Sequence, residues 1–116
     1  MARIITDGTR LKPAIIARHM SYDYVRYCVE NNEIFSKGQF YCGITNDIDA
    51  NYSRHKNEEF RGRDFEYVSI YMCASAADAA SVESLLQKEG FDCGNTATPG
   101  NGGADDSIYV YMFKKP

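Results

Sequence analysis

The segment Gln39–Ile48 constrains the fold of this chain most strongly, because its hydrophobic period changes in the middle. Its first half alternates in the way that a half-buried strand does; the alternating apolar residues are Phe40, Cys42 and Ile44. Thr45, Asn46 and Asp47 then offer side chains that cap helices, and the spacing becomes helical. We therefore expect a strand that turns sharply into a helix, with Gly43 where the backbone approaches a neighbouring group closely.

Patterns elsewhere in the chain predict the remaining elements. Alternation predicts strands at three further places: 22–29, 65–73 and 107–114. Helical spacing and capping residues predict two helices: 47–56 and 75–89, the second ended by Gly90. Pro13 is a favourable first residue for a short helix that reaches Met20. Turn signals separate 22–29 from 39–44, so we expect these two strands to form an antiparallel hairpin.

Length and composition limit the class of protein. A chain of 116 residues forms one domain of ordinary size and can bury a core without disulfides or metals. Its four cysteines contain no Cys-x-x-Cys pair, so buried free thiols are expected. Neither an apolar leader nor a membrane-length apolar run is found, so we expect a cytoplasmic protein with no membrane partner. The net charge of −3 restricts any nucleic-acid site to a local patch.

Part of this pattern resembles the second half of the GIY-YIG nuclease signature. In that family, a strand that ends in Tyr-x-Gly leads into a helix that starts Thr/Ala-Asn/Lys-Asp-Leu. Tyr41–Gly43 and Thr45–Ile48 take these places here, and His55 follows the glycine at the family's spacing. The resemblance therefore implies a phosphodiester-cleaving site built around this strand and helix.

The first half of the signature is matched more loosely. Tyr24 and Tyr27 form a Tyr-x-x-Tyr pattern in which Tyr24 is the preferred match, but the glycine and isoleucine of the family name are absent. The resemblance implies an α+β fold, with a small antiparallel sheet flanked by helices in the order β-β-α-β-α over residues 22–95. Within a single domain of residues 1–116, residues 1–21 would be an N-terminal extension with a short helix, and 104–116 an added C-terminal strand.

The resemblance also assigns roles to individual residues. Glu83 lies where the family keeps a glutamate that binds a single metal ion, Mg²⁺ or Mn²⁺. Tyr24 and His55 are the candidates for accepting a proton, and Tyr41 would position the attacking water or the phosphate. Asn95 follows Glu83 at a spacing found in some family members. Together these residues predict a metal-dependent endonuclease that acts on nucleic acid, with DNA expected before RNA.

One position departs from the family pattern. The arginine that should follow Gly43 by eight residues is Asn51, which carries no charge to bind a phosphate. Arg54 lies three residues later and is the candidate replacement. Loss of one preorganised charge stabiliser typically slows catalysis by about 100- to 1,000-fold. Arg61 and Arg63 follow in a loop, and we interpret them, with Asn51 and Asn95, as candidate contacts to nucleic acid.

Each of these residues also has a structural interpretation, which leaves the function open. The tyrosines can be strand aromatics, His55 a helix-end cation, and Glu83 the partner of Arg26 or Arg54 in a salt bridge. Two hypotheses remain beside chance similarity: a metal-dependent nuclease slowed by Asn51, or a non-catalytic module of the same shape that binds nucleic acid or a protein partner. A protein partner could also supply specificity to an active nuclease.

Overall fold

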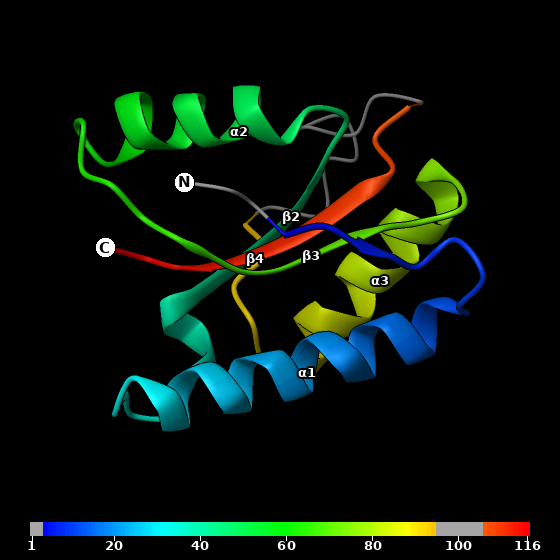
Figure 1. Cartoon of the computed structure of the whole chain (residues 1–116), viewed down its shortest axis with the longest axis horizontal. Coiled ribbons are helices and arrows are strands. Elements are labelled where there is room, and N and C mark those ends of the chain that lie inside the picture. Colours follow the sequence, from blue (N-terminus) through cyan, green and yellow to red (C-terminus); the bar gives the residue numbers. More distant parts are fainter. Residues whose placement is uncertain (1–3, 95–105) are drawn as a thin grey trace.

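The computed structural model describes residues 4–94 and 106–116, and strands and helices alternate along the chain (Figure 1). The elements are β1 (Thr6–Asp7), α1 (Pro13–Glu30), β2 (Phe40–Thr45), α2 (Ile48–Arg54), β3 (Tyr67–Met72), α3 (Ala76–Glu89) and β4 (Tyr109–Lys114). A short 3₁₀ helix, Lys37–Gln39, precedes β2, and a π-helical turn, His55–Glu59, continues α2. Asn95 lies outside the described residues.

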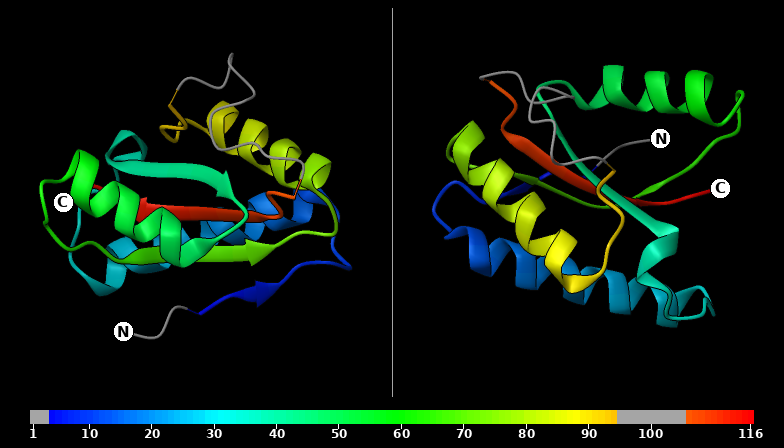
Figure 2. Two further views of the ribbon diagram at one scale, coloured as in Figure 1. Left: turned by 90° about the horizontal axis from the view of Figure 1, so that it is seen from above. Right: turned by 180° about the vertical axis from the view of Figure 1, so that it is seen from behind.

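The four strands form one mixed sheet in the order β1-β3-β4-β2. β4 is antiparallel to both β2 and β3, whereas β1 is parallel to β3. Helices α1 and α3 cover one face of the sheet, and α2 covers the other (Figures 1 and 2). The fold is therefore α+β, as predicted, with a small sheet flanked by helices. The sheet is mixed, however, and not purely antiparallel.

The predicted strand at 22–29 is wrong, because these residues form the second half of α1. Apolar residues occur on two sides of this helix: Tyr24 and Cys28 are buried, whereas Tyr22, Val25 and Val29 are exposed. In the sequence the buried and the exposed apolar residues are read together, so the helical period is hidden and the pattern resembles the two-residue repeat of a strand. The predicted hairpin and the order β-β-α-β-α are wrong for the same reason.

The antiparallel partner of β2 is β4, which we had expected to be an added strand. Gly43 of β2 pairs with Tyr111 of β4, and Tyr41 pairs with Phe113. The C-terminal strand is thus a central strand of the sheet, between β2 and β3. A strand in this position is covered on both faces, which explains why its residues from Tyr109 to Phe113 are all apolar or aromatic and only Lys114, at its end, is charged.

The short helix predicted from Pro13 to Met20 is wrong in its length, because α1 continues to Glu30, and the described residues of the predicted N-terminal extension supply β1 and part of the core. The other predicted strands and helices are confirmed, with the capping groups that the sequence indicated. The Asp47 side chain accepts a hydrogen bond from the Ala50 amide at 3.1 Å at the start of α2. Ser75 accepts one from the Asp78 amide at 3.1 Å at the start of α3. Gly90 ends α3 with φ 107°, a left-handed conformation that glycine adopts without strain.

The two faces of the sheet are packed with different side chains. Under α1 and α3 the core is mainly aliphatic and sulfur-containing, and the four cysteines are buried there as free thiols, as expected. Under α2 it is mainly aromatic, with Phe65, Tyr111 and Phe113 at its centre. Each fully buried large side chain contributes about 1.5–3 kcal/mol to the free energy of unfolding. Within residues 4–94 and 106–116, none of the helices combines the length and apolar character needed to cross a membrane.

Candidate functional site

Four of the predicted site residues meet at the β2 edge of the sheet. Tyr41 lies on β2 itself, with Arg54 and His55 from the helix on one side and Glu83 from α3 on the other. β2 is an edge strand beside α3 (Figure 2, left). We call Tyr41 and the four charged residues that act on its hydroxyl the β2-edge cluster; these are Arg54, Glu59, Glu83 and Asp92.

The ring of Tyr41 packs in the aromatic core under α2, and its hydroxyl lies near Gly94, beside the edge of β2. Its ring stacks on Phe113 at 5.4 Å and meets the His55 ring edge-on at 5.4 Å. Residues 91–93 continue the sheet beside it, because Asp92 exchanges backbone hydrogen bonds with Phe40 and Cys42. A Cβ atom at Gly94 would lie 3.0 Å from the Tyr41 hydroxyl, so a glycine leaves that hydroxyl room. The phenol therefore sits at the border between core and surface.

The Tyr41 phenol is protonated under physiological conditions. Its pKa is raised to about 12, mainly by burial, with a contribution from the carboxylates of Glu59, Glu83 and Asp92 that the nearby Arg54 opposes. Because the phenol keeps its proton, it can donate a hydrogen bond to a phosphate oxygen or a water. It is a poor proton acceptor, and a role in positioning water or phosphate stays a prediction.

Beneath the β2-edge cluster lies a buried chain of hydrogen bonds that we call the Tyr111 network. It links four side chains from α2, the π-helical turn, β3 and β4: Asn51, His55, Tyr67 and Tyr111. The Asn51 amide donates to the Tyr111 hydroxyl at 3.2 Å and accepts from the Tyr67 hydroxyl at 2.8 Å. Nε2 of His55 lies 3.0 Å from the same Tyr111 hydroxyl.

This network determines the protonation state of His55. Since the Tyr111 oxygen already accepts a hydrogen bond from Asn51, its own proton is free to be donated to Nε2 of His55. The imidazole proton then lies on Nδ1, and an oxygen of Glu59 is 2.8 Å from that atom, although without hydrogen-bond geometry. Burial lowers the pKa of His55, while the Glu59 charge opposes the shift. His55 is thus a neutral, buried side chain rather than a helix-end cation.

Asn51 belongs to the core. Its side chain is 3% exposed, and both polar atoms of the amide are engaged by tyrosine hydroxyls. It therefore does not face a ligand in solution. The space at this position suits a short neutral amide, and the guanidinium of the family pattern would be buried against Tyr111 and Tyr67.

Gly43 is required by the same network. A Cβ atom at this position would lie 2.5 Å from the Tyr111 hydroxyl oxygen. The expectation that the backbone approaches a neighbour closely here is therefore confirmed, and the neighbour is the cross-strand tyrosine. The glycine allows the Tyr111 hydroxyl to lie against β2 and reach His55.

Glu83 is the least compensated charge of the β2-edge cluster. It is half-buried on α3 beside the fully buried Val82, and its carboxylate makes no ion pair or hydrogen bond with another described residue. Burial raises the pKa of this carboxyl to about 7. The expected alternative, a salt bridge to Arg26 or Arg54, is not formed. A half-buried carboxylate without a partner is strained in its charged form and would gain from a bound cation.

The side chains of the β2-edge cluster supply only some of the ligands that a metal ion needs. Within the described part of the chain, no three His, Cys, Asp or Glu side chains are grouped as metal ligands. Glu83 would supply one oxygen, and water and a phosphate would have to supply the rest, as Mg²⁺ commonly accepts. The residues present are therefore compatible with one weakly held, oxygen-bound divalent cation.

Arg54 is exposed, but its guanidinium turns back over the site. Nη2 lies 3.5 Å from Nε2 of His55, and its charge acts on the Tyr41 hydroxyl. Although Arg54 lies three residues after Asn51 on the helix, its guanidinium still lies at the β2-edge cluster. Arg61 and Arg63 lie in the exposed loop after the π-helical turn.

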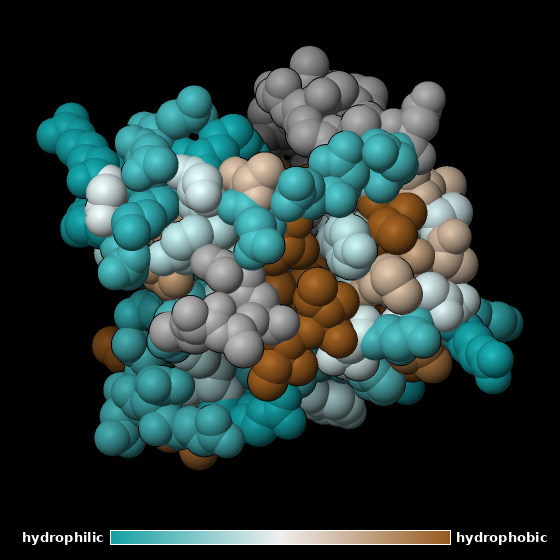
Figure 3. All heavy atoms as spheres, turned by 45° about the horizontal axis from the view of Figure 1, so that its top comes forward, coloured by the Kyte–Doolittle hydropathy of each residue, from teal (hydrophilic) through white to brown (hydrophobic). Residues whose placement is uncertain are grey.

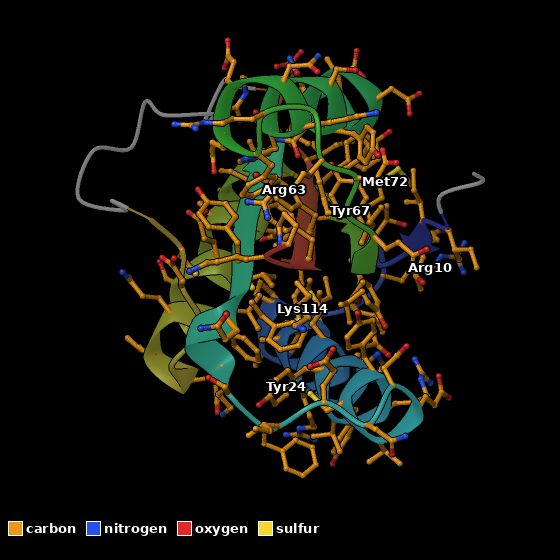
Figure 4. The ribbon with its side chains drawn as sticks, turned by 90° about the vertical axis from the view of Figure 1, so that its left-hand side faces the viewer. Arg10, Tyr24, Arg63, Tyr67, Met72 and Lys114 are labelled. Atoms are coloured by element: carbon orange, nitrogen blue, oxygen red, sulfur yellow. The ribbon has the colours of Figure 1, made fainter. Side chains whose placement is uncertain are left out.

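Tyr24 is not part of this arrangement. It is 3% exposed on α1, where its ring meets Phe40 at 4.9 Å and Phe91 at 5.1 Å, both edge-on. Figure 4 shows Tyr24 on the α1 side of the sheet, whereas Tyr67 and Arg63 lie on the α2 side. The sheet therefore separates Tyr24 from His55.

The sequence analysis missed Tyr111, Tyr67 and Glu59 as parts of the site. Tyr111 had been assigned to strand packing, since alternation alone does not reveal which strand pairs with β2. The available signal was Gly43, which indicates a close approach without saying which side chain makes it. Comparison of the chain with family models, curated proteins and solved structures finds no match to any of them.

Proposed function

We propose that this chain is a GIY-YIG-like endonuclease domain, which hydrolyses phosphodiester bonds of nucleic acid, DNA before RNA, with a single divalent cation. The observation that carries the proposal is the convergence of Tyr41, Arg54 and Glu83 at the edge of β2. A hydrogen-bond donor, a cation and an unpaired carboxylate are the groups that phosphodiester hydrolysis needs around the phosphate.

The strand pairing supports a rearranged form of the family signature. The resemblance expects a tyrosine-bearing strand antiparallel to the strand of Tyr41. In this chain β4 is the antiparallel partner of β2, and its Tyr111 contacts His55. We therefore propose that β4 takes the place of the missing first strand, and that Tyr111 takes the place first given to Tyr24.

Each residue then has a role that its environment allows. Arg54 would bind a phosphate oxygen through its planar guanidinium, and the protonated Tyr41 would donate a hydrogen bond to phosphate or water. Neutral His55 is 1% exposed and its Nε2 already accepts the Tyr111 proton, so it would hold Tyr111 and the Tyr41 ring in position and would not take a proton from water directly. Glu83 would hold Mg²⁺ or Mn²⁺, which when bound stabilises phosphate charge and activates water.

A cleavage assay with matched variants tests the proposal. Plasmid DNA and single-stranded and structured oligonucleotides are incubated with Mg²⁺ or Mn²⁺ and either wild type, Glu83→Gln or Arg54→Gln. We expect slow cleavage by wild type, and a loss of about 100-fold or more in each variant, the usual cost of one charge stabiliser. Glu66→Gln and Arg10→Gln alter exposed residues outside the β2-edge cluster and should cleave like wild type.

Two results would contradict the nuclease proposal. Cleavage that survives Glu83→Gln undiminished would show that the metal is held elsewhere or that the activity is a contaminant. No cleavage by wild type under any of these conditions, with the fold intact by circular dichroism, would remove the catalytic role.

A non-catalytic module that binds nucleic acid or a protein partner is the second candidate. The observation in its favour is Asn51, which is integrated into the Tyr111 network and leaves the phosphate site with one arginine. In this case an oligonucleotide should bind without being cut, and Arg54→Gln should weaken binding. Salt dependence of the affinity would count the phosphate contacts.

A further inference from the structure

The outward face of α1 carries apolar side chains where a surface helix normally carries polar ones. Tyr22, Val25 and Val29 are 65%, 44% and 64% exposed. Their spacing of three and four residues places them in one stripe along the helix. Ile34 and Phe35, just beyond the end of α1, are 84% and 61% exposed and extend the apolar surface. We call these five residues the α1 stripe.

The charges that flank the helical part of the α1 stripe, Tyr22 to Val29, have opposite signs. Arg18 lies one turn before Tyr22, and Glu30 follows Val29 directly. Both are exposed, and neither makes an ion pair with another described residue. The first turn of α1 contains no acidic residue, and the last turn contains no basic one, so the helix dipole is not compensated within the chain.

We propose that two copies of this chain associate through their α1 stripes, with the two helices antiparallel. In a two-fold arrangement centred between Asp23 and Tyr24, Tyr22 of one copy faces Val25 of the other, and the reverse contact forms by symmetry. Arg18 of each copy then faces Val29 of the other, and its long side chain can reach Glu30 at the next position. Tyr22 and Val25 meet at the centre, flanked by Arg26, which is ion-paired with Asp23 within each copy, and two pairs of opposite charges lie toward the ends.

An antiparallel arrangement also places the positive end of each helix dipole near the negative end of the other. A parallel arrangement would instead bring Arg18 against Arg18 and Glu30 against Glu30. The charge pattern therefore favours a second copy in one orientation. The contact is small, so we expect an interface at the low end of the usual size range and a dissociation constant on the order of micromolar.

The proposed dimer leaves the candidate site open. α1 and α2 lie on opposite faces of the sheet, so two chains joined through α1 present their α2 sides outward (Figure 1). Figure 3 shows hydrophilic side chains over much of this view, with an apolar patch near its centre and smaller ones toward the edges. The dimer is therefore independent of the proposed nuclease activity and can be tested without it.

Sedimentation velocity of the full chain over a concentration series tests the proposal. Wild type should shift from monomer to dimer as concentration rises through the micromolar range. Val25→Glu buries a charge at the centre of the interface and should weaken association about 10-fold or more. Ser84→Glu adds the same charge on the exposed face of α3 and should leave association unchanged. A wild type that stays monomeric up to hundreds of micromolar, or a Val25→Glu variant that still dimerises, overturns the proposal.

Charge reversal tests the antiparallel orientation. Arg18→Glu and Glu30→Arg should each weaken the dimer about five-fold, because each reverses one partner in both symmetric pairs. The double variant restores opposite charges and should return the affinity close to that of wild type. Both positions are exposed, so the fold should persist. If the double variant is weaker than either single one, the antiparallel pairing is wrong.

Discussion

The two faces of the sheet both bury tyrosines, but they satisfy the hydroxyl groups differently. On the α1 side, Tyr24 packs edge-on between Phe40 and Phe91, and the Cys28 thiol is the polar neighbour that acts on its hydroxyl. On the α2 side, the Tyr111 hydroxyl contacts both Asn51 and His55. The first face is a packed core, whereas the second is a core with a buried polar network. A buried tyrosine therefore indicates a site only when its hydroxyl has specific partners.

Placing a charge in the Tyr111 network should have the largest effect. Asn51→Arg introduces the arginine expected from the GIY-YIG resemblance but buries a guanidinium beside two tyrosine hydroxyls, and an uncompensated buried charge costs about 3 kcal/mol or more. We expect a strongly destabilised protein without gained cleavage. Chemical denaturation measures the free energy of unfolding, with Asn57→Arg as the control at an exposed position of the adjoining π-helical turn. A stable, active Asn51→Arg protein would show that the side chain can turn outward.

Filling the space between Gly43 and Tyr111 should have the next largest effect on the free energy of unfolding. Gly43→Ala places a Cβ atom 2.5 Å from the Tyr111 hydroxyl, so β2 or the ring must shift, at about 1–3 kcal/mol. The matched control is Gly38→Ala, where a Cβ atom would meet nothing within 4 Å. Thermal or urea unfolding should therefore separate the two alanine variants. Equal stability would mean that the Tyr111 hydroxyl is free to move away.

Removing one tyrosine hydroxyl from each face of the sheet compares directly what the two hydroxyls contribute to stability. Tyr111→Phe leaves the Asn51 amide and Nε2 of His55 without their shared partner, which should cost about 1–3 kcal/mol. Tyr24→Phe removes a hydroxyl with only a weak thiol partner and should change the free energy of unfolding by less than about 0.5 kcal/mol. Urea unfolding of both variants gives the two values. Equal losses would remove the distinction between the two faces.

The remaining expected effect is a pH dependence caused by Glu83. Burial raises its pKa to about 7 in the folded chain, above the ordinary 4.5, so folding favours the protonated form. The free energy of unfolding should therefore fall as pH rises from about 4.5 to about 7, and level off above that. Glu83→Gln removes this contribution and should exceed wild type in stability at pH 8 but not at pH 4.

The same measurement separates Glu83 from His55, whose shift has the opposite sign. Burial lowers the pKa of His55 below the ordinary 6.5, so its contribution to stability is lost as pH falls below that value. This loss is shared by wild type and Glu83→Gln, and it cancels in their difference. A difference that does not depend on pH would show that the Glu83 carboxyl has an ordinary pKa.

Local chemistry determined most of the elements from the sequence alone. Asp47, Ser75 and Gly90 mark helix ends through their own hydrogen bonds or backbone freedom, so their roles depend on neighbours only a few residues away. The same holds for the alternation of β2, β3 and β4. Prediction from the local pattern was wrong at the second half of α1, where the exposed apolar residues Tyr22, Val25 and Val29 obscure the helical period.

Only the tertiary structure decided which residues share the site. The pairing of β2 with β4 joins Gly43 to a tyrosine 68 positions later in the chain, and no local pattern encodes such a contact. It buries Asn51 and His55, brings Glu83 beside Tyr41, and leaves Tyr24 on the opposite face. The sequence determined the candidate side chains and their spacing. Long-range strand order decided their neighbours, because the same side chain has different chemistry on each face of a sheet.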